Sequence, residues 1–148
     1  MSYATEADLV RKWGAEQVDL AAFDGATQAR DPLRIEAALD SASAVMNGYF
    51  AKRYALPIDA APDGVTLLRN LCCDLAMGEL SNTPGARNDI VKDAVEAARK
   101  FLSDVARGLA DIPQNPPPGA PAAAVPSPNE AIVAANDREF SRNRLRAM

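Results

Sequence analysis

A chain of 148 residues is long enough for one domain and an appendage, because domains commonly run about 100 to 150 residues. The formal net charge of −4 argues against a protein that coats nucleic acid along its whole surface. Apolar residues make up 48% of the chain and aromatic ones only 5%, which favours closely packed helices built from Ala, Leu and Val over sheets. With no secretory signal and no apolar run of membrane-spanning length, we expect synthesis and retention in a cytoplasm.

The first elements are short. Thr5 is a helix-capping residue, and Asp8 three positions later completes a capping box, so a first helix should begin at Thr5 and end at Gly14. Val18 to Ala22 is compatible with another short turn of helix. The following residues 23–30 contain Asp24-Gly25 and are predicted to form a loop.

The next segment predicts one long amphipathic helix. Asp31 is an N-cap residue before a proline at the first helical position, and the helix should run to about Lys52. Pro57 forbids continuation and holds Leu56 in an extended conformation. Apolar side chains step by four and three positions and so share one face: Ile35, Leu39, Ala42, Met46 and Tyr49.

A third long helix is expected from Gly64 to Leu80. Its apolar residues cover nearly the whole circumference, which places it in the middle of a bundle, and Gly78 could permit a close helix crossing. The adjacent Cys72 and Cys73 cannot form a disulfide without breaking that helix, so we expect a reduced, buried pair.

The last long helix should run from about Asn88 to Arg107, with Gly108 as its C′ residue. Its inward face is predicted to hold Val91, Ala94, Val95, Ala98, Phe101, Leu102 and Val105. The fold class is therefore all-α, a small bundle of about four helices.

Composition changes sharply after this bundle. Residues 113–128 hold seven of the eleven prolines and no charge, and should form an extended spacer of about 3.1 Å per residue, up to roughly 50 Å. Residues 1–112 carry 12 basic and 17 acidic side chains, net −5, whereas residues 113–148 carry 4 basic and 3 acidic, net +1. We predict a helical domain over 1–112, a linker over 113–128 and a docking segment over 129–148.

The docking segment combines cationic and apolar side chains. Its candidate partner-binding residues are Arg138, Phe140, Arg142, Arg144, Leu145 and Arg146. Arginines beside two apolar anchors suit a protein groove better than a phosphate backbone. By composition alone, a disordered tail without a role is an equally good interpretation.

Catalytic and metal-binding patterns are missing from the sequence. There is no histidine, which removes the usual general base and the commonest metal ligand, and one vicinal cysteine pair cannot make a zinc site. The glycines do not form a phosphate-binding loop. Outward carboxylates are better explained as solvated surface or subunit contacts than as an acid/base pair: Asp40, Asp89, Asp93 and Glu96. We predict no enzyme, no cofactor and no metal.

Basic residues of the helical part occur as isolated pairs at Arg11-Lys12, Lys52-Arg53 and Arg99-Lys100. Sequence-specific or strong backbone binding to DNA would need a cationic face. The acidic domain therefore predicts at most passage of DNA without sequence-specific contact.

Several short motifs resemble one protein family. They are Tyr3-Ala4-Thr5 with Asp8-Leu9, then Gly48-Tyr49, then Arg53-Tyr54-Ala55-Leu56-Pro57, and finally Arg138-Glu139-Phe140-Ser141-Arg142 with Leu145. Their order and spacing resemble head–tail adaptor (head completion, neck connector) proteins of Mu-like phages and prophages. The third and fourth helices match only in pattern, and the linker is richer in Pro and Ala than is usual there.

The resemblance implies a structural virion protein in the neck between capsid and tail, made in the host cytoplasm. It implies an expected twelvefold ring under the portal protein, which extends the channel for double-stranded DNA and receives the next neck or tail-completion protein, without any membrane. It also implies structural roles for the motif residues Tyr3, Asp8, Tyr49, Arg53, Tyr54, Leu56 and Pro57.

Two other functional classes stay open. A small cytoplasmic helical regulatory or scaffolding protein could present the prolines around Pro116-Pro117-Pro118 to a partner. A nucleic-acid-binding helical domain is the third possibility, disfavoured by the acidic domain.

Overall fold

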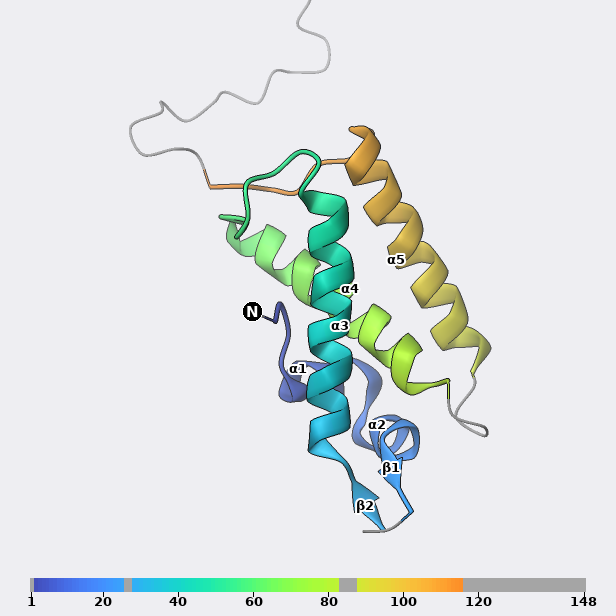
Figure 1. The fold of residues 1–148 in the computed structure, drawn as a ribbon. Coiled ribbons are helices and arrows are strands. Elements are labelled where there is room, and N and C mark those ends of the chain that lie inside the picture. The colour runs from blue at the N-terminus through green and yellow to red at the C-terminus, as the bar shows by residue number, and fades with distance from the viewer. Residues whose placement is uncertain (1, 26–27, 83–87, 116–148) are drawn as a thin grey trace, which may run out of the picture. The chain divides into compact units, whose positions relative to one another are not determined.

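The computed structural model describes residues 2–25, 28–82 and 88–115. Within these residues the chain forms a mainly helical bundle (Figure 1), which confirms the predicted fold class. The helices are α1 Glu6–Trp13, α2 Ala15–Ala21, α3 Pro32–Phe50, α4 Pro62–Leu80 and α5 Asp89–Arg107, and the two short strands are β1 Phe23–Asp24 and β2 Ala29–Arg30.

The helix ends lie close to where the local signals predicted them. Thr5 and Asp8 form the reciprocal capping box of α1. Asp31 accepts hydrogen bonds from the backbone N–H groups of Leu33 and Arg34, and Asn88 caps α5 in the same way. Gly108 ends α5 at a φ of +81°, a left-handed conformation that favours glycine.

Three boundaries differ from the prediction. Residues 23–30, predicted as a loop, contain the antiparallel pair β1–β2, with Phe23 opposite Arg30. Arg30 fixes this pair to the rest of the fold because it forms ion pairs with Glu6 and Asp19. Helix α2 begins at Ala15 instead of Val18. Helix α4 begins at Pro62 instead of Gly64, because proline has no backbone N–H and therefore suits the first position of a helix.

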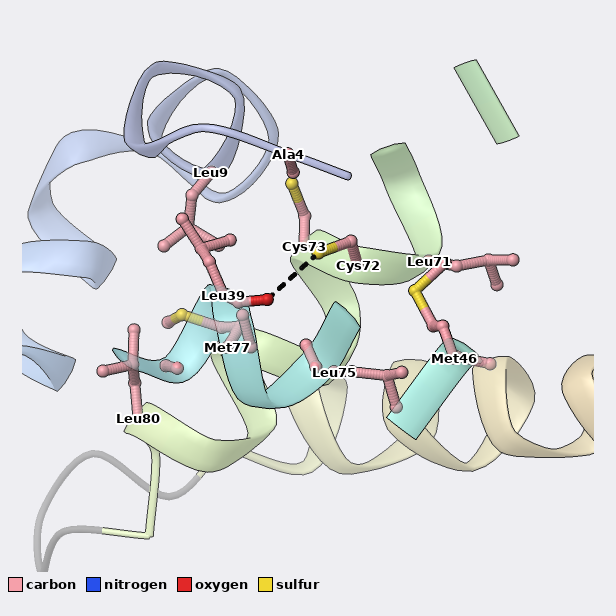
Figure 2. Close-up of a cluster of buried hydrophobic side chains, with 14 of the residues drawn as sticks. Ala4, Leu9, Leu39, Met46, Leu71, Cys72, Cys73, Leu75, Met77 and Leu80 are labelled. Carbon is pink, nitrogen blue, oxygen red and sulfur yellow. Dashed lines mark hydrogen bonds between the residues drawn. The ribbon is translucent and has the colours of Figure 1, made fainter. Parts of the chain in front are cut away.

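Helix α4 is the central element, as its apolar circumference predicted. It contacts α1, α2, α3 and α5. Figure 2 shows the buried cluster around it, in which the Cys72 thiol donates to the carbonyl oxygen of Leu39 at 3.7 Å. Cys72 and Cys73 are both buried and free, as expected.

The crossing of α4 and α5 is close at Gly78. A Cβ atom at this position would collide with Cγ2 of Val95, so the absence of a side chain is what allows the approach. On α5, the buried residues are Val91, Ala98, Leu102 and Val105, while Ala94, Val95 and Phe101 are half-buried. Across the described residues, no helix combines the length and apolar character that crossing a membrane requires.

Candidate site at the chain exit

The N-terminal motif residue Tyr3 is fastened to α3. Its hydroxyl donates to Oδ1 of Asn47 at 2.6 Å, and its backbone N–H donates to the Ser43 hydroxyl at 3.1 Å. Ser43 is itself buried and donates to the Leu39 carbonyl oxygen. Burial raises the pKa of the Tyr3 hydroxyl above its ordinary value.

The second motif residue, Asp8, joins α1 to α4. Its carboxylate accepts from the Thr5 backbone and hydroxyl, and lies 3.5 Å from the Arg69 guanidinium of α4. The hydrogen bond from the Thr5 side chain holds the pKa of Asp8 below its ordinary value. Tyr3 and Asp8 therefore connect the N-terminal segment to α3 and α4.

An aromatic row follows at the end of α3. The ring of the fully buried Phe50 meets Tyr3 and Tyr54 edge to face, each at a centroid distance of 6.3 Å. The sequence predicted Tyr49 on the inward face, but Tyr49 is only half-buried and Phe50 occupies the core. The apolar stripe steps from Met46 by four residues instead of three, and both steps are allowed on a helix with 3.6 residues per turn.

Arg53 holds the segment that follows α5. Its Nη1 donates to the carbonyl oxygens of Val105 at 3.1 Å and Ala110 at 3.2 Å, and lies 3.0 Å from the Asp111 carboxylate. Its guanidinium also lies 5.7 Å from the centre of the Tyr54 ring. One side chain thus connects the end of α3 to the end of α5 and to the chain beyond it.

Tyr54 completes this connection. Its hydroxyl accepts from the Ile112 backbone N–H at 3.2 Å and donates to Asp111 Oδ1 at 3.1 Å. Ile112 is buried in the same core as Phe50. The two motif residues therefore hold residues 108–112 against the bundle.

The rest of the motif lies in the loop between α3 and α4. Leu56 is 43% exposed, and its bond to Pro57 is cis. Later in this loop, the Ala61 N–H donates to the Pro113 carbonyl oxygen, and the Asn115 N–H donates to Asp59. The Asn115 amide also donates to the Asp59 carboxylate at 2.7 Å. Residues 113–115, predicted as the first part of the linker, are paired with this loop.

We define the chain exit as residues 108–115 together with Arg53, Tyr54 and the loop residues 59–61 that bind them. Sequence reasoning identified Arg53 and Tyr54 but missed their partners Val105, Ala110 and Asp111, which lie more than 50 positions away. Ser43 and Asn47 were missed too. A polar residue inside an apolar helical stripe is the signal that could have indicated Ser43.

The six predicted partner-binding residues lie outside the described residues: Arg138, Phe140, Arg142, Arg144, Leu145 and Arg146. Their role stays a prediction. The structure describes the chain up to residue 115, and the statements about residues 116–148 rest on the sequence.

Burial shifts the pKa of the ionisable core groups toward their neutral forms. Burial raises the pKa of the Cys73 thiol to about 12 and that of Cys72 in the same direction, so both thiols are protonated at neutral pH. Burial also raises the pKa of Asp74, opposed by Lys12, whose ammonium lies 2.6 Å from the carboxylate. Among residues 2–25, 28–82 and 88–115, no cluster of three or more His, Cys, Asp or Glu side chains could hold a metal ion.

Comparisons with known proteins agree with the motifs. The family model described as Bacteriophage Mu, Gp36 matches residues 3–134 of this chain. The chain is also 26% identical over 110 residues to the Mu-like prophage FluMu protein gp36 of Haemophilus influenzae, with 74% of each chain covered.

Proposed function

The chain belongs to the Bacteriophage Mu, Gp36 family, and from this premise we propose that it is a virion protein that joins head to tail. The resemblance to proteins of Mu-like phages that its motifs predicted is thereby confirmed. The proposal goes beyond the family assignment in three points: the adaptor role, the position in the neck and the partners.

In this proposal, copies of the chain form a ring, expected to be twelvefold, beneath the portal protein of a filled head. The ring extends the channel for double-stranded DNA and presents a platform to the next neck or tail-completion protein. Its mechanism is geometric and includes no catalysis: subunits become ordered on a template, and neighbours bury surface on each other.

The chain exit is the observation that supports this proposal best. Arg53 and Tyr54 bind residues 108–112, and the loop after α3 pairs with residues 113–115. The C-terminal segment therefore starts from a defined point on a packed domain. A tethered second contact acts at high effective concentration, so many weak contacts around a ring add up to a stable assembly.

The charge distribution also supports the proposal. Residues 1–112 carry a net charge of −5, from 12 basic and 17 acidic side chains. A net acidic wall repels phosphates and lets DNA pass without being retained. A protein that holds DNA would need the opposite sign.

The test removes residues 116–148 from the prophage copy of the gene and leaves the bound residues 108–115 in place. We expect the shortened protein to keep its helical circular dichroism and cooperative unfolding, but to be missing from heads purified from an induced lysate. Heads should then accumulate without tails in electron micrographs.

A matched control replaces residues 116–128 with a Gly/Ser linker of equal length, which keeps the docking segment. Normal particles from the truncated protein would contradict an adaptor with a docking arm. Capture of a soluble cellular partner by the tagged full chain, without portal or neck proteins, would instead favour the scaffolding alternative, and salt-sensitive DNA retention would favour a nucleic-acid-binding domain.

A further inference from the structure

A groove runs along one side of the bundle, away from the chain exit. It is formed by the middle of α3, the last turns of α4 and the first turns of α5, which lie together in Figure 1. Its volume is about 860 Å³, within the range of sites that hold apolar side chains of a ligand.

The floor of the groove is apolar and partly open. Val45 on α3 is 46% exposed there, next to the buried Ala42 and the half-buried Val95 of α5. An exposed valine between two helices loses contact with water when a partner covers it, which favours binding of an apolar group.

A second observation comes from Ser81, which lines the same groove. Ser81 is only 6% exposed, and its hydroxyl has no hydrogen-bond partner among the described residues. A buried hydroxyl without a partner costs free energy, so an occupant that brings a polar group would be stabilised here once a side-chain movement exposes the Ser81 hydroxyl, which has almost no accessible surface in the free chain.

The rim of the groove is acidic on balance. It carries Glu79, Asp89 and Glu96 against Lys92 and Arg99. Lys92 lies 4.0 Å from Glu96, whereas the carboxylates of Glu79 and Asp89 have no ion pair within the described part of the chain. Such a rim disfavours a nucleic acid and favours a cationic peptide.

We propose that this groove receives residues 129–148 of a neighbouring copy. Residues 129–148 carry four arginines against three acidic residues, net +1, and three of these arginines lie in the last nine residues, 140–148, which hold no acidic residue and complement the rim. Phe140 and Leu145 supply apolar side chains for the floor around Val45. The predicted linker of residues 113–128, extended to roughly 50 Å, is long enough to reach from one copy to the next.

This inference rests on the proposed ring, because a ring places the groove of one copy near the segment of the next. It makes the interface heterologous, with two different surfaces in contact, which is the type of interface that closes into a ring. The test measures pairwise docking of the segment in the groove between free copies, without the portal template, so the inference and the proposed function can fail separately.

The experiment mixes two full-length variants, a tagged Val45→Cys chain and an untagged Ser141→Cys chain, under mildly oxidising conditions. Thr66→Cys is the matched control, because Thr66 is exposed on α4 and does not line the groove. The native cysteines are buried, and wild-type protein measures any contribution from them.

We expect the Val45→Cys and Ser141→Cys chains to form a disulfide-linked heterodimer at least about tenfold faster than the Thr66→Cys and Ser141→Cys chains, because docking raises the effective concentration of the thiols. Equal rates, or no heterodimer, would overturn the proposal. So would a Val45→Cys/Ser141→Cys double variant whose tagged and untagged copies, when mixed, form disulfides only within their own chains.

Discussion

Arg53 donates a hydrogen bond from Nη1 to the carbonyl oxygen of Val105 at 3.1 Å, across 52 positions of sequence. The bond joins the turn after α3 to the last turn of α5, where helix carbonyl groups need partners from outside the helix. The same nitrogen reaches the Ala110 carbonyl oxygen and the Asp111 carboxylate. Arg53 therefore acts together with Tyr54 and the loop residues 59–61 to hold the chain exit against the bundle.

We expect Arg53→Ala to lower the free energy of unfolding by about 1 kcal/mol, since the lost contacts are partly screened by solvent. Arg53→Lys should restore less than half of this loss, because an ammonium group cannot match the fork geometry of a guanidinium. Urea unfolding followed by circular dichroism measures both. Lys52→Ala is the control, since Lys52 is exposed and next in sequence. Equal unfolding midpoints for Arg53→Ala and Lys52→Ala would mean that the guanidinium does not hold the exit.

Tyr54→Phe should open the exit locally while keeping the ring contact with Phe50. The substitution removes the acceptor of the Ile112 backbone N–H and the donor to Asp111. Hydrogen exchange at the Ile112 amide should speed up by about tenfold, the equivalent of about 1.4 kcal/mol. Tyr49→Phe is the matched control, because no hydrogen bond of the Tyr49 hydroxyl occurs within the described residues. Unchanged exchange in Tyr54→Phe would show that Ile112 is protected by burial alone.

The sequence predicted the parts of this fold that depend on near neighbours. The caps formed by Thr5, Asp31 and Asn88 each use a partner two or three residues away; the first two were predicted as caps, and the third lies where the sequence placed the start of the helix. The central position of α4 followed from its apolar circumference, because a helix without a polar face must be covered on all sides.

The missed features depend on distant partners. The β1–β2 pair is held by Arg30, whose ion-pair partners Glu6 and Asp19 come from two earlier helices. The Arg53 and Tyr54 motif was found through family resemblance. Two of the oxygens that Arg53 binds are main-chain carbonyl oxygens, which every residue has, so the sequence could not indicate them as partners. The sequence therefore identified Arg53 and Tyr54, and only the three-dimensional fold showed which distant residues they bind.

The glycines of α3 and α4 should respond to alanine in opposite directions. In Gly78→Ala the new methyl group meets Val95, a β-branched residue with little rotamer freedom, so we expect a loss of about 1 to 2 kcal/mol in the free energy of unfolding. In Gly48→Ala the methyl group meets open space, so helix propensity should add about 0.5 to 1 kcal/mol. Thermal or urea unfolding gives both values. In the Val95→Ala background Gly78→Ala should cost less than in the wild type, and an equal cost in both backgrounds would show that Val95 does not limit the crossing.

Stability should decrease in alkaline solution because of the buried thiols. The pKa of Cys73 is raised from 9.0 to about 12 in the folded chain, so above pH 9 the unfolded chain releases a proton that the folded chain retains. The free energy of unfolding then falls as pH rises from about 9 to 12, by up to about 1.4 kcal/mol per pH unit for this group. Urea midpoints measured across this range should fall less steeply in Cys73→Ala. An identical slope in the variant would assign the alkaline loss to other groups, such as the Tyr3 hydroxyl, whose pKa is also raised.

The docking segment should depend more on its apolar anchor than on any single charge. Phe140 and Arg144 lie outside the described residues, so this prediction rests on their chemistry. A desolvated aromatic anchor commonly contributes about 2 kcal/mol or more to binding, whereas an arginine at a solvated rim contributes less than about 1 kcal/mol. Phe140→Ala should therefore reduce incorporation into particles more than Arg144→Ala does, measured by quantitative mass spectrometry relative to the portal protein. Ser127→Ala in the linker serves as the control and should incorporate normally. A larger defect in Arg144→Ala would indicate that charge pairing, and not apolar burial, dominates docking of the segment.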